Sequence, residues 1–534
     1  MLTDVLIVGA GPTGLMLANQ LGRRGIRATI IDRHSGPAQQ TRAMAVHART
    51  LEIYQKLGIA DRAIELGLPG VGANFWSRGR KQARIPLGDM GKGQSRFPYV
   101  LMLGQDDNER LLGDHLHHLG VDIGWNTELV ALRQERTQVT ATIKEANGLT
   151  RDIVAAYVAG CDGGRSAVRE MNGIGFPGEP YEHVFFVADT EATGTMVQDE
   201  LNVDLWKDGF HLYFPMKGRD RWRVIGILPR GLRDRDHLTF EDLLPVLSAE
   251  TGTALTFKSC SWFSTYRIHH RCAERFRDRR CFLLGDAAHV HSPMGGQGMN
   301  TGLQDAYNLA WKLALVISQQ ADATLLDTYE AERMPFAHRL LATTDRAFRL
   351  VVSENWLAGL LRTRVMTTLV GLAMRRTQVR KAAFRTLSQI GVSYRQSALS
   401  QRLDGAPAHG PRAGDRFPWL HLRFQTNGPR EDLFDRLDDT TFNLLAIGQR
   451  VPPLASLGLG DMLRVHEIPD DAENAHALAA VSIRGPAFYV LRPDGHIGLV
   501  GAQVEPQALA HWFARFAVRH KVVDRRHGFA AATN

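Results

Sequence analysis

Three glycines near the start of the chain have the spacing of a turn that binds a dinucleotide. Gly9, Gly11 and Gly14 follow the apolar run 5–8 and open a segment whose apolar residues recur at helical spacing. In such a turn the first glycine makes the tight bend, the second lets a pyrophosphate approach the backbone, and the third allows the helix to pack closely on the strand. The N-terminus of the helix then offers unpaired N–H groups to the phosphates.

A second apolar run follows at the distance expected of a strand–helix–strand unit. Residues 28–31 form this run, and it ends at Asp32, where a carboxylate can accept hydrogen bonds from an adenosine ribose. The strand, the helix and the terminal acid occur in the required order. The sequence therefore predicts a bound dinucleotide and not an ordinary glycine-rich turn.

Two more turns of related chemistry come later in the chain. The predicted strand 153–158 leads into Cys161-Asp162-Gly163, and the buried strand 280–284 leads into Gly285-Asp286. The second turn continues through the glycine-rich loop 293–300 into a helix with apolar residues every three or four positions. We expect both turns to lie at strand ends, where ligands bind in α/β sheets.

The elements between these turns show a change of pattern. Residues 41–54 are predicted as a helix and 99–103 as a strand, with Gln105 at the corner where the next helix starts. From about residue 180 to 270 the periodicity becomes β-like, which predicts an inserted sheet. The loop 405–414 marks a boundary, and the remainder has the pattern of a small α/β domain.

Composition excludes several classes of protein. The chain has 534 residues, 44% hydrophobic and 22% charged, which is typical of globular proteins and not of disordered or coiled-coil proteins. Its net charge of +8 is small for this length and its arginines are dispersed, so we expect contacts with small anions and not a nucleic-acid track. Four cysteines without a C-x-x-C pair favour a reducing compartment. No export signal and no membrane span is predicted, so the expected location is cytoplasmic.

The order of the three motifs resembles that of the single-component FAD-dependent aromatic hydroxylases, from residue 2 to about 340. The sequences of residues 289–306 and of Tyr329-x-x-Glu-Arg333 are most similar to those of the branch that acts on substituted phenols, such as the pentachlorophenol and nitrocatechol monooxygenases. The resemblance implies an α/β fold with a Rossmann-like FAD-binding domain and a helical extension, residues 1–180 and 271–400. It further implies a β-sheet substrate domain at 181–270 and a thioredoxin-like C-terminal domain at 411–534. The C-terminal domain contains no cysteine, which excludes a dithiol role.

The same resemblance implies that residues from all three motifs hold FAD, while NADPH or NADH binds only transiently as co-substrate. Asp286 would accept hydrogen bonds from the ribityl chain, and Arg42 would contact phosphate or NAD(P)H. The backbone N–H groups of Met299 and Asn300 would face flavin N1 and O2 and stabilise the anionic reduced flavin. The implied cofactor-binding residues are Gly9, Gly11, Pro12, Thr13, Gly14, Asp32, Arg33, Arg42, Gln105, Asp162, Asp286, Pro293, Gly296, Gly298, Met299 and Asn300.

The implied reaction is hydroxylation of a substituted phenol or related aromatic by molecular oxygen, through an FAD C4a-hydroperoxide. A phenol becomes a better nucleophile when it loses its proton, so a base or a hydrogen-bond relay should face the ring. Strand alternation places His211 and Tyr213 on one face of the inserted sheet. The candidate catalytic residues are His47, His211, Tyr213, Arg223 and Pro293.

Other interpretations stay open from the sequence alone. Another flavoenzyme, a halogenase or a reductase, is one alternative, although the W-x-W-x-I-P signature of flavin halogenases is missing. A non-catalytic flavoprotein that binds RNA or a protein partner is another. His289-x-His291 has no clear set of further ligands, so no metal is expected. The ring substituents, the choice between NADH and NADPH, and assembly into a homo-oligomer are not encoded in any motif that we recognise.

Overall fold

The structure is a computed structural model, and the chain folds into two compact units. The first contains residues 1–23, 27–307 and 333–392, and the second contains residues 24–26, 308–332 and those from Ser393 onward. The structure describes residues 1–38, 43–206, 209–233, 235, 237–251, 255–292, 294–352, 373–374 and 376–520.

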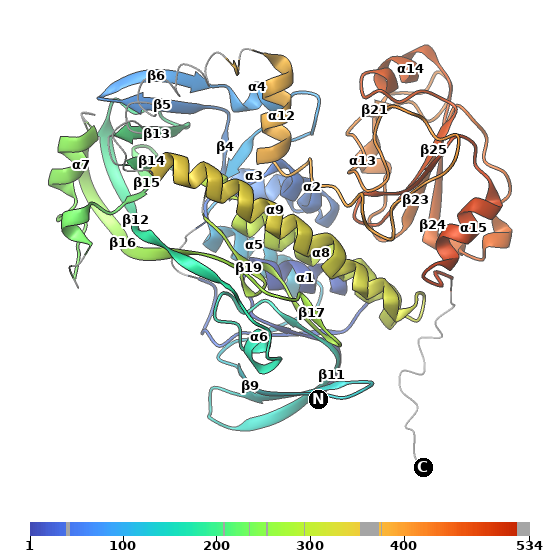
Figure 1. The fold of residues 1–534 in the computed structure, drawn as a ribbon, viewed down its shortest axis with the longest axis horizontal. Helices are drawn as coiled ribbons and strands as arrows, with labels where there is room; N and C mark the ends of the chain where they lie inside the picture. Colours follow the sequence, from blue (N-terminus) through green and yellow to red (C-terminus); the bar gives the residue numbers. More distant parts are fainter. Residues whose placement is uncertain are drawn as a thin grey trace. The chain divides into compact units, whose positions relative to one another are not determined.

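The first sheet of unit 1 brings the ends of the three motif strands to one edge. Strands β1 (Leu2–Val8), β2 (Ala28–Ile31), β11 (Thr150–Gly160) and β18 (Cys281–Leu283) run parallel, in the order β18-β11-β1-β2. Helix α1 (Pro12–Gly22) connects β1 to β2, which confirms the predicted strand–helix–strand unit. Because carboxyl ends of parallel strands meet at the same edge, the three turns lie together. Figure 1 labels α1 and β11 in this part of the fold.

The segment after residue 43 differs from the predicted continuous helix. It first forms the short strand β3 (Ala45–Val46), and helix α2 (Ala48–Leu57) begins only after His47. Strand β3 pairs with β7 (Val100–Met102). This sheet pairing outweighs the helical spacing of the apolar residues, as tertiary contacts commonly do. Helix α5 (Gln105–His118) begins at the predicted corner.

The second sheet of unit 1 has eight strands in the order β19-β16-β12-β15-β14-β13-β5-β6. Three of its strands, β5 (Ala73–Ser77), β6 (Arg80–Ile85) and β19 (His289–Val290), come from outside the segment 181–270 that we expected to supply this sheet. The others are β12 (Gly178–Gly194), β13 (Leu201–Trp206), β14 (Gly209–Pro215), β15 (Arg221–Ile227) and β16 (Leu255–Cys272).

The two faces of this sheet have different surroundings. One face packs in a hydrophobic cluster with Leu243 and with Leu247 of α7 (Leu244–Thr251), and its members include Phe186 and Tyr213. The other face carries a separate cluster that includes Phe185, Phe210 and Ile227. Strand alternation separates the two sets, since neighbouring residues along a strand point to opposite faces.

Two long helices follow the third motif. Helix α8 (Gly298–Ile317) begins in the glycine-rich loop, and α9 (Asp327–Val352) follows it in the chain. Each helix begins in one unit and ends in the other. Helix α12 (Thr377–Leu387) is the last helix of unit 1.

Unit 2 contains a five-stranded sheet and a buried set of charges. The sheet order is β20-β26-β25-β23-β24, with helices α14 (Ala472–Ala479) and α15 (Pro506–Ala514). Its strands are β20 (Gln401–Arg402), β23 (Phe442–Ile447), β24 (Leu463–Ile468), β25 (Ala487–Leu491) and β26 (Ile497–Gly501). Glu332 accepts hydrogen bonds from Lys312 at 2.8 Å and from Arg492 at 2.5 Å, and all three side chains are fully buried. Each charge therefore has a partner, which such burial requires.

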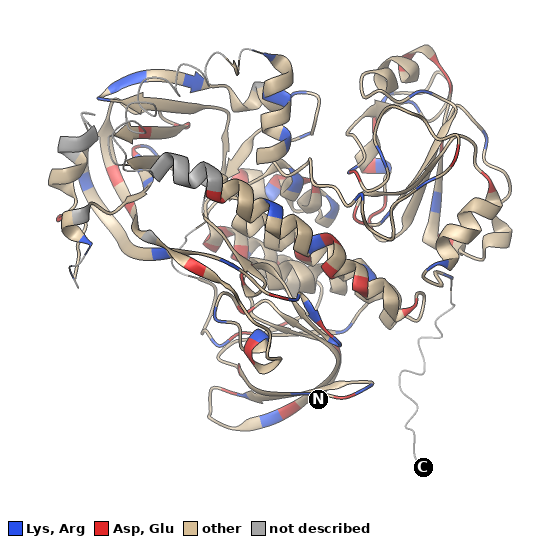
Figure 2. Ribbon diagram, viewed as in Figure 1, with Lys and Arg blue, Asp and Glu red and all other residues tan. Residues whose placement is uncertain are grey.

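Figure 2 shows acidic and basic residues interspersed over the elements of each unit. This distribution agrees with the dispersed arginines of the sequence. Among the helices of the described segments, none is both long enough and apolar enough to cross a bilayer.

Candidate active site

The glycine turn after β1 provides a cradle for a pyrophosphate. Gly9 has φ of 104°, and a Cβ atom on it would lie 2.3 Å from the carbonyl oxygen of Cys161. A Cβ on Gly14 would lie 1.9 Å from the oxygen of Gly9, so helix and strand pack too closely for any side chain. A Cβ on Gly11 would meet nothing within 4 Å. Open space at the second glycine and close packing at the other two fit a bound dinucleotide.

The N-terminus of α1 is available to an anion. Pro12 stands at the start of the helix, and no side chain caps the preceding Gly11. Thr13 reaches the third motif, because Cβ atoms on Gly285 and Gly302 would lie 2.7 and 2.2 Å from its Oγ1. One residue of the first turn thus contacts the start of the third turn and the first part of α8.

Asp32 is held against the glycine turn. Its Oδ2 accepts from the N–H of Ala10 at 2.7 Å, and its Oδ1 accepts from the N–H of His34 at 2.8 Å. Nδ1 of His34 also lies 2.7 Å from Oδ1. Oδ2 keeps a lone pair that can accept from a ribose hydroxyl. Arg33 is exposed beside it, while Arg42 lies outside the described residues.

The second turn is organised by Asp162 itself. Its carboxylate accepts from the hydroxyl of Ser166 and, at 3.1 Å, from the N–H of Val168 in α6 (Ala167–Met171). Burial raises the pKa of Asp162, against the effect of these hydrogen bonds. Asp162 therefore shapes its own turn, and its expected contact with the cofactor stays a prediction.

Gln105 begins α5 and donates from Nε2 to Oε1 of Glu109 at 2.8 Å. The other oxygen of Glu109 accepts from the N–H of Ala38 at 2.8 Å. The pair links the start of α5 to the chain that follows β2. The amide oxygen of Gln105 makes none of these bonds.

A buried network of charged side chains, which the sequence motifs did not predict, contacts the third turn. Oδ2 of Asp305 accepts from the N–H of Gly285 at 3.0 Å and lies 2.8 Å from Nε2 of His289. Oδ1 accepts from Nε of Arg333 at 2.6 Å, and Arg333 also donates to the carbonyl of Thr301 at 3.1 Å. His289 is therefore occupied by Asp305. Asp286 follows Gly285 directly and is exposed.

The loop before α8 is fixed by Asn300, which is fully buried. Its Oδ1 accepts from the N–H of His47 at 2.9 Å and from the hydroxyl of Thr50 at 2.7 Å. Its Nδ2 donates to the carbonyls of Ala45 at 2.7 Å and Gly296 at 2.9 Å. The side chain of Asn300 thus joins the loop to the corner where α2 begins.

His47 lies against the same loop. Its Nε2 is 2.9 Å from the carbonyl oxygen of Gly295, and Gly295 and Gly296 both have positive φ, of 77° and 63°. Burial lowers the pKa of His47 to about 4, so the ring is neutral at pH 7. Pro293 lies outside the described residues.

The two other residues of the loop contact neighbouring helices and side chains. Met299 accepts from Nδ2 of Asn108 at 3.3 Å through its sulfur. A Cβ on Gly298 would lie 3.8 Å from the ring of His291, which is ordinary contact. The loop is therefore packed on one side by α5 and on the other by the segment after β19.

The candidates on the inserted sheet are divided between its faces. His211 and Tyr213 do share a face, as predicted, but it is the face packed against α7. The ring of His211 stacks on Trp206 with 5.7 Å between centroids, and burial lowers its pKa to about 3. Burial raises the pKa of Tyr213. Arg223 lies on the opposite face, where it pairs with Asp189.

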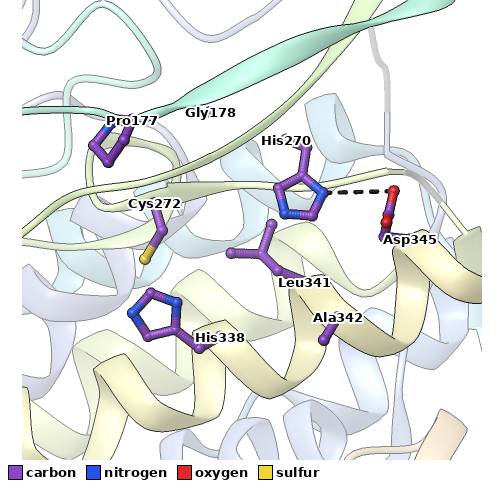
Figure 3. Close-up of a pocket in the computed structure, with 8 residues that line it drawn as sticks. All are labelled: Pro177, Gly178, His270, Cys272, His338, Leu341, Ala342 and Asp345. Carbon is purple, nitrogen blue, oxygen red and sulfur yellow. Dashed lines mark ion pairs between the residues drawn. The ribbon is translucent and has the colours of Figure 1, made fainter.

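A pocket of about 480 Å³ lies elsewhere in unit 1, between β16, the start of β12 and α9 (Figure 3). His270 and His338 line it, and Asp345 accepts from the hydroxyl of Tyr181 at 2.9 Å. None of the predicted site residues lines this pocket. It is therefore distinct from the convergence of the three motifs.

Thiol and metal chemistry have no support in the described part of the chain. All four cysteines are free, and burial raises the pKa of each thiol. The described residues contain no group of three His, Cys, Asp or Glu side chains placed to hold a metal ion. The thiols are thus poor nucleophiles.

Comparison with known proteins identifies the family. A family model described as "FAD binding domain" matches residues 2–344. The chain is 33% identical to 6-methylpretetramide 4-monooxygenase of Streptomyces rimosus, over 93% of this chain and 90% of that one. It is 34% identical to pentachlorophenol 4-monooxygenase of Sphingobium chlorophenolicum, over 83% and 79% of the two chains.

A solved structure extends the similarity through both units. The OxyS anhydrotetracycline hydroxylase from Streptomyces rimosus superposes with a TM-score of 0.76 and 28% identity, over 97% of this chain and 99% of that one. These relatives are monooxygenases and hydroxylases, and none is a halogenase, a reductase or a non-catalytic flavoprotein. The chain belongs to the FAD binding domain family and is an FAD-dependent aromatic monooxygenase.

Proposed function

We propose that this enzyme uses NAD(P)H and molecular oxygen to hydroxylate a phenolic ring, with His47 as the group that accepts the phenol proton. FAD, when bound, supplies the reducing equivalents taken from NAD(P)H and activates oxygen. The residues of this chain bind and orient the two reactants and control the proton. The observation that carries the proposal is the environment of the His47 ring.

The hydrogen bonds of His47 assign its tautomer. The carbonyl oxygen of Gly295 can only accept, so Nε2 of His47 carries the proton. Nδ1 is then the unprotonated nitrogen, and it is buried without a hydrogen-bond partner among the described residues. A buried acceptor that lacks a donor is costly unless a ligand or water supplies one. A phenol hydroxyl beside the glycine loop would supply this donor.

Burial of His47 also determines how strong a base its ring is. Since its pKa is lowered to about 4, His47 is a weak base that takes a full proton only reluctantly at pH 7. It serves best by accepting a hydrogen bond that withdraws the proton as the ring is attacked. That interaction strengthens in the transition state, which is what raises the rate.

The remaining predicted residues would hold the cofactor. We assign the pyrophosphate to the turn of Gly9, Gly11 and Gly14, and the adenosine ribose to Asp32. We assign the ribityl chain to Asp286 and the flavin ring to the loop 294–300. Open space at Gly11 and the uncapped start of α1 support the first assignment.

The substrate is expected to be a phenol, but the relatives do not favour the substituted-phenol branch alone. One relative is named for pentachlorophenol, and others are named for 6-methylpretetramide, anhydrotetracycline and rifampicin. We therefore propose a phenolic ring within the wider class of aromatic compounds.

We also propose that residues 411–534, the C-terminal part of unit 2, form a thioredoxin-like domain. The mixed sheet β26-β25-β23-β24 with α14 and α15 supports this assignment. It contains no cysteine, so a dithiol redox role is excluded.

The test is oxidation of NADPH and NADH by the purified holoenzyme with and without phenols, catechols and naphthols, followed by product identification. The proposal expects phenol-stimulated consumption coupled to one added hydroxyl group. Stimulation by non-phenolic rings alone would contradict it. Consumption that yields only hydrogen peroxide with every phenol would contradict it as well.

A further inference from the structure

The face of the inserted sheet turned away from α7 contains a cross-strand row of distinctive composition. Phe214 of β14 pairs with Arg223 of β15, Arg223 pairs with Asp189 of β12, and Asp189 pairs with Trp262 of β16. Residues directly opposite one another in antiparallel strands share a face. An ion pair is thus flanked on both sides by aromatic side chains.

The adjoining rows on this face differ. Glu191 pairs with Arg221 in the row on one side, whereas the rows on the other side are apolar along β14, β15 and β12. Leu212, Ile225 and Val187 form the next row, and Phe210, Ile227 and Phe185 form the one after it. The side chains of Leu212, Phe214 and Trp262 are only half-buried, whereas those of Tyr213 and Val224 on the α7 face are closed off. An aromatic ring laid on this face would therefore cover exposed apolar surface, which is favourable.

Arg223 has a hydrogen-bonding capacity that the described residues do not use. Its Nε and Nη2 each donate to Asp189 at 2.6 Å, and its guanidinium carbon lies 5.5 Å from the centroid of the Trp262 ring. The residue is 2% exposed, and Nη1 is buried without a partner. An unpaired guanidinium N–H in such a place costs free energy unless an acceptor reaches it.

The charge balance of the Arg223–Asp189 pair indicates which kind of substrate group would accept from Nη1. The bidentate contact with Asp189 already neutralises Arg223. A substrate carboxylate at Nη1 would add a second negative charge beside Asp189, at a guanidinium that is buried and already paired, which is costly. A neutral carbonyl oxygen accepts the same hydrogen bond without adding charge.

We infer that Arg223 is a specificity-determining residue whose Nη1 donates to a carbonyl oxygen of the substrate, so that the preferred substrate is a phenol fused or joined to an aryl ketone. The inference rests on the proposed function, since it concerns the same substrate. Asp189 acts as a positioning residue, because its two hydrogen bonds fix the direction of the free Nη1–H.

Two probes that differ in a single group test this inference. They are 5-hydroxy-1-tetralone and 5,6,7,8-tetrahydro-1-naphthol, which share a skeleton and a phenol and differ by a carbonyl in place of a methylene. Binding to the oxidised holoenzyme is measured by the change in flavin absorbance. A hydrogen bond from a charged donor predicts roughly tenfold or more tighter binding of the ketone. 3-Hydroxybenzoate serves as the carboxylate probe and is expected to bind more weakly than the ketone.

The variants remove the donor without leaving a lone charge. In the Arg223→Met, Asp189→Asn double variant, the preference for the ketone should fall to within about twofold, while affinity for the tetrahydronaphthol is retained. Arg84→Gln is the matched control, because Arg84 pairs with Glu200 at the edge strand of the same sheet. It should keep the full preference. Flavin content and thermal unfolding of each variant are compared to verify folding.

The possible outcomes separate this inference from the proposed function. Equal or weaker wild-type binding of the ketone, tighter binding of the carboxylate, or an unchanged preference in the double variant would each overturn the role of Arg223. If the wild type hydroxylates simple phenols but excludes the ketone, the carbonyl assignment fails and the proposed function stands. If no phenol stimulates NAD(P)H consumption, the proposed function itself fails.

Discussion

Arg333 on α9 donates from Nε to Oδ1 of Asp305 on α8 at 2.6 Å, and both side chains are fully buried. The same carboxylate accepts from the N–H of Gly285 through its other oxygen. Two stretches that read as separate motifs in the sequence are therefore one buried assembly. It supports the turn that precedes Asp286 and the first residues of α8.

We expect loss of one partner of this pair to destabilise the fold strongly. Arg333→Met leaves the Asp305 carboxylate without its cation, and breaking a buried pair in this way costs about 3–5 kcal/mol. Urea unfolding of the apoprotein measures this loss. The Arg333→Met, Asp305→Leu double variant should be less destabilised than Arg333→Met alone. A double variant that is worse would show that the network is needed as a whole.

The pH dependence of this contribution has a defined sign. Arg333 and His289 lower the pKa of Asp305 below its usual range despite its burial. A depressed carboxyl pKa adds stability that is fully present above the unfolded pKa of about 3.9 and is lost as the pH falls through the folded value. Asp305→Asn should therefore have a lower free energy of unfolding than wild type at pH 7. This difference between the two proteins should become smaller below about pH 4.

We expect substitutions at Gly11 and at Gly14 to have different effects on FAD binding and on the stability of the apoprotein. Gly11→Val places its side chain in open space with an extended backbone, so the apoprotein should keep its stability within about 0.5 kcal/mol. FAD retention should fall at least roughly tenfold, because the side chain occupies the path of the pyrophosphate. Gly14→Val collides with the backbone of Gly9 and should destabilise the apoprotein itself. Flavin released on denaturation and the thermal midpoint of apoprotein are the two readouts. Full flavin content in Gly11→Val would contradict the cradle assignment.

The sequence was sufficient for the parts of the fold that depend on local pattern. The spacing of Gly9, Gly11 and Gly14, the strand before them and the strand ending near Asp32 were all predicted correctly. Local rules suffice here because turn, strand and helix each have a signature within a few residues. The helix expected from Thr41 begins only at Ala48, because residues 45 and 46 pair instead with a strand more than fifty residues away.

Relations between distant side chains could not be predicted in the same way. Nothing in the sequence indicates that Asn300 joins His47 to Gly296, or that Asp305 joins Gly285 to Arg333. Strand alternation correctly predicted that His211 and Tyr213 share one face of the sheet, but it could not predict that this face packs against α7. Which face packs against a helix depends on the packing of the whole sheet.

We expect His47→Gln to slow hydroxylation by about 10²-fold, the range typical of a lost proton acceptor. Glutamine can still donate to the carbonyl of Gly295, so flavin content and stability should change little. The readout specific to a proton role is rescue. A phenol acidic enough to be ionised at neutral pH should be hydroxylated at nearly the wild-type rate by the variant, because no proton need be removed.

His117→Gln is the matched control for this prediction, since His117 is exposed on α5 and should tolerate the change. An equal loss of rate with ionised and un-ionised phenols in His47→Gln would mean that His47 only supports the loop. Unchanged rates with both kinds of phenol in His47→Gln would show that His47 takes no part in the reaction.

The buried histidines predict a further dependence of stability on acid. Burial lowers the pKa of His211 to about 3, while the unfolded chain takes up a proton near pH 6.5. The unfolded state thus binds more protons below pH 6.5, and the free energy of unfolding should decline as the pH falls from 6.5 toward 4, by on the order of 3 kcal/mol from this residue. His211→Phe removes the titrating group and should flatten the decline between pH 6.5 and 4. Urea unfolding at pH 7, 6, 5 and 4 measures the slope, with His117→Phe as the exposed control. The same slope in His211→Phe and wild type would show that His211 becomes protonated in the folded state, and that the closed packing against Trp206 opens to water.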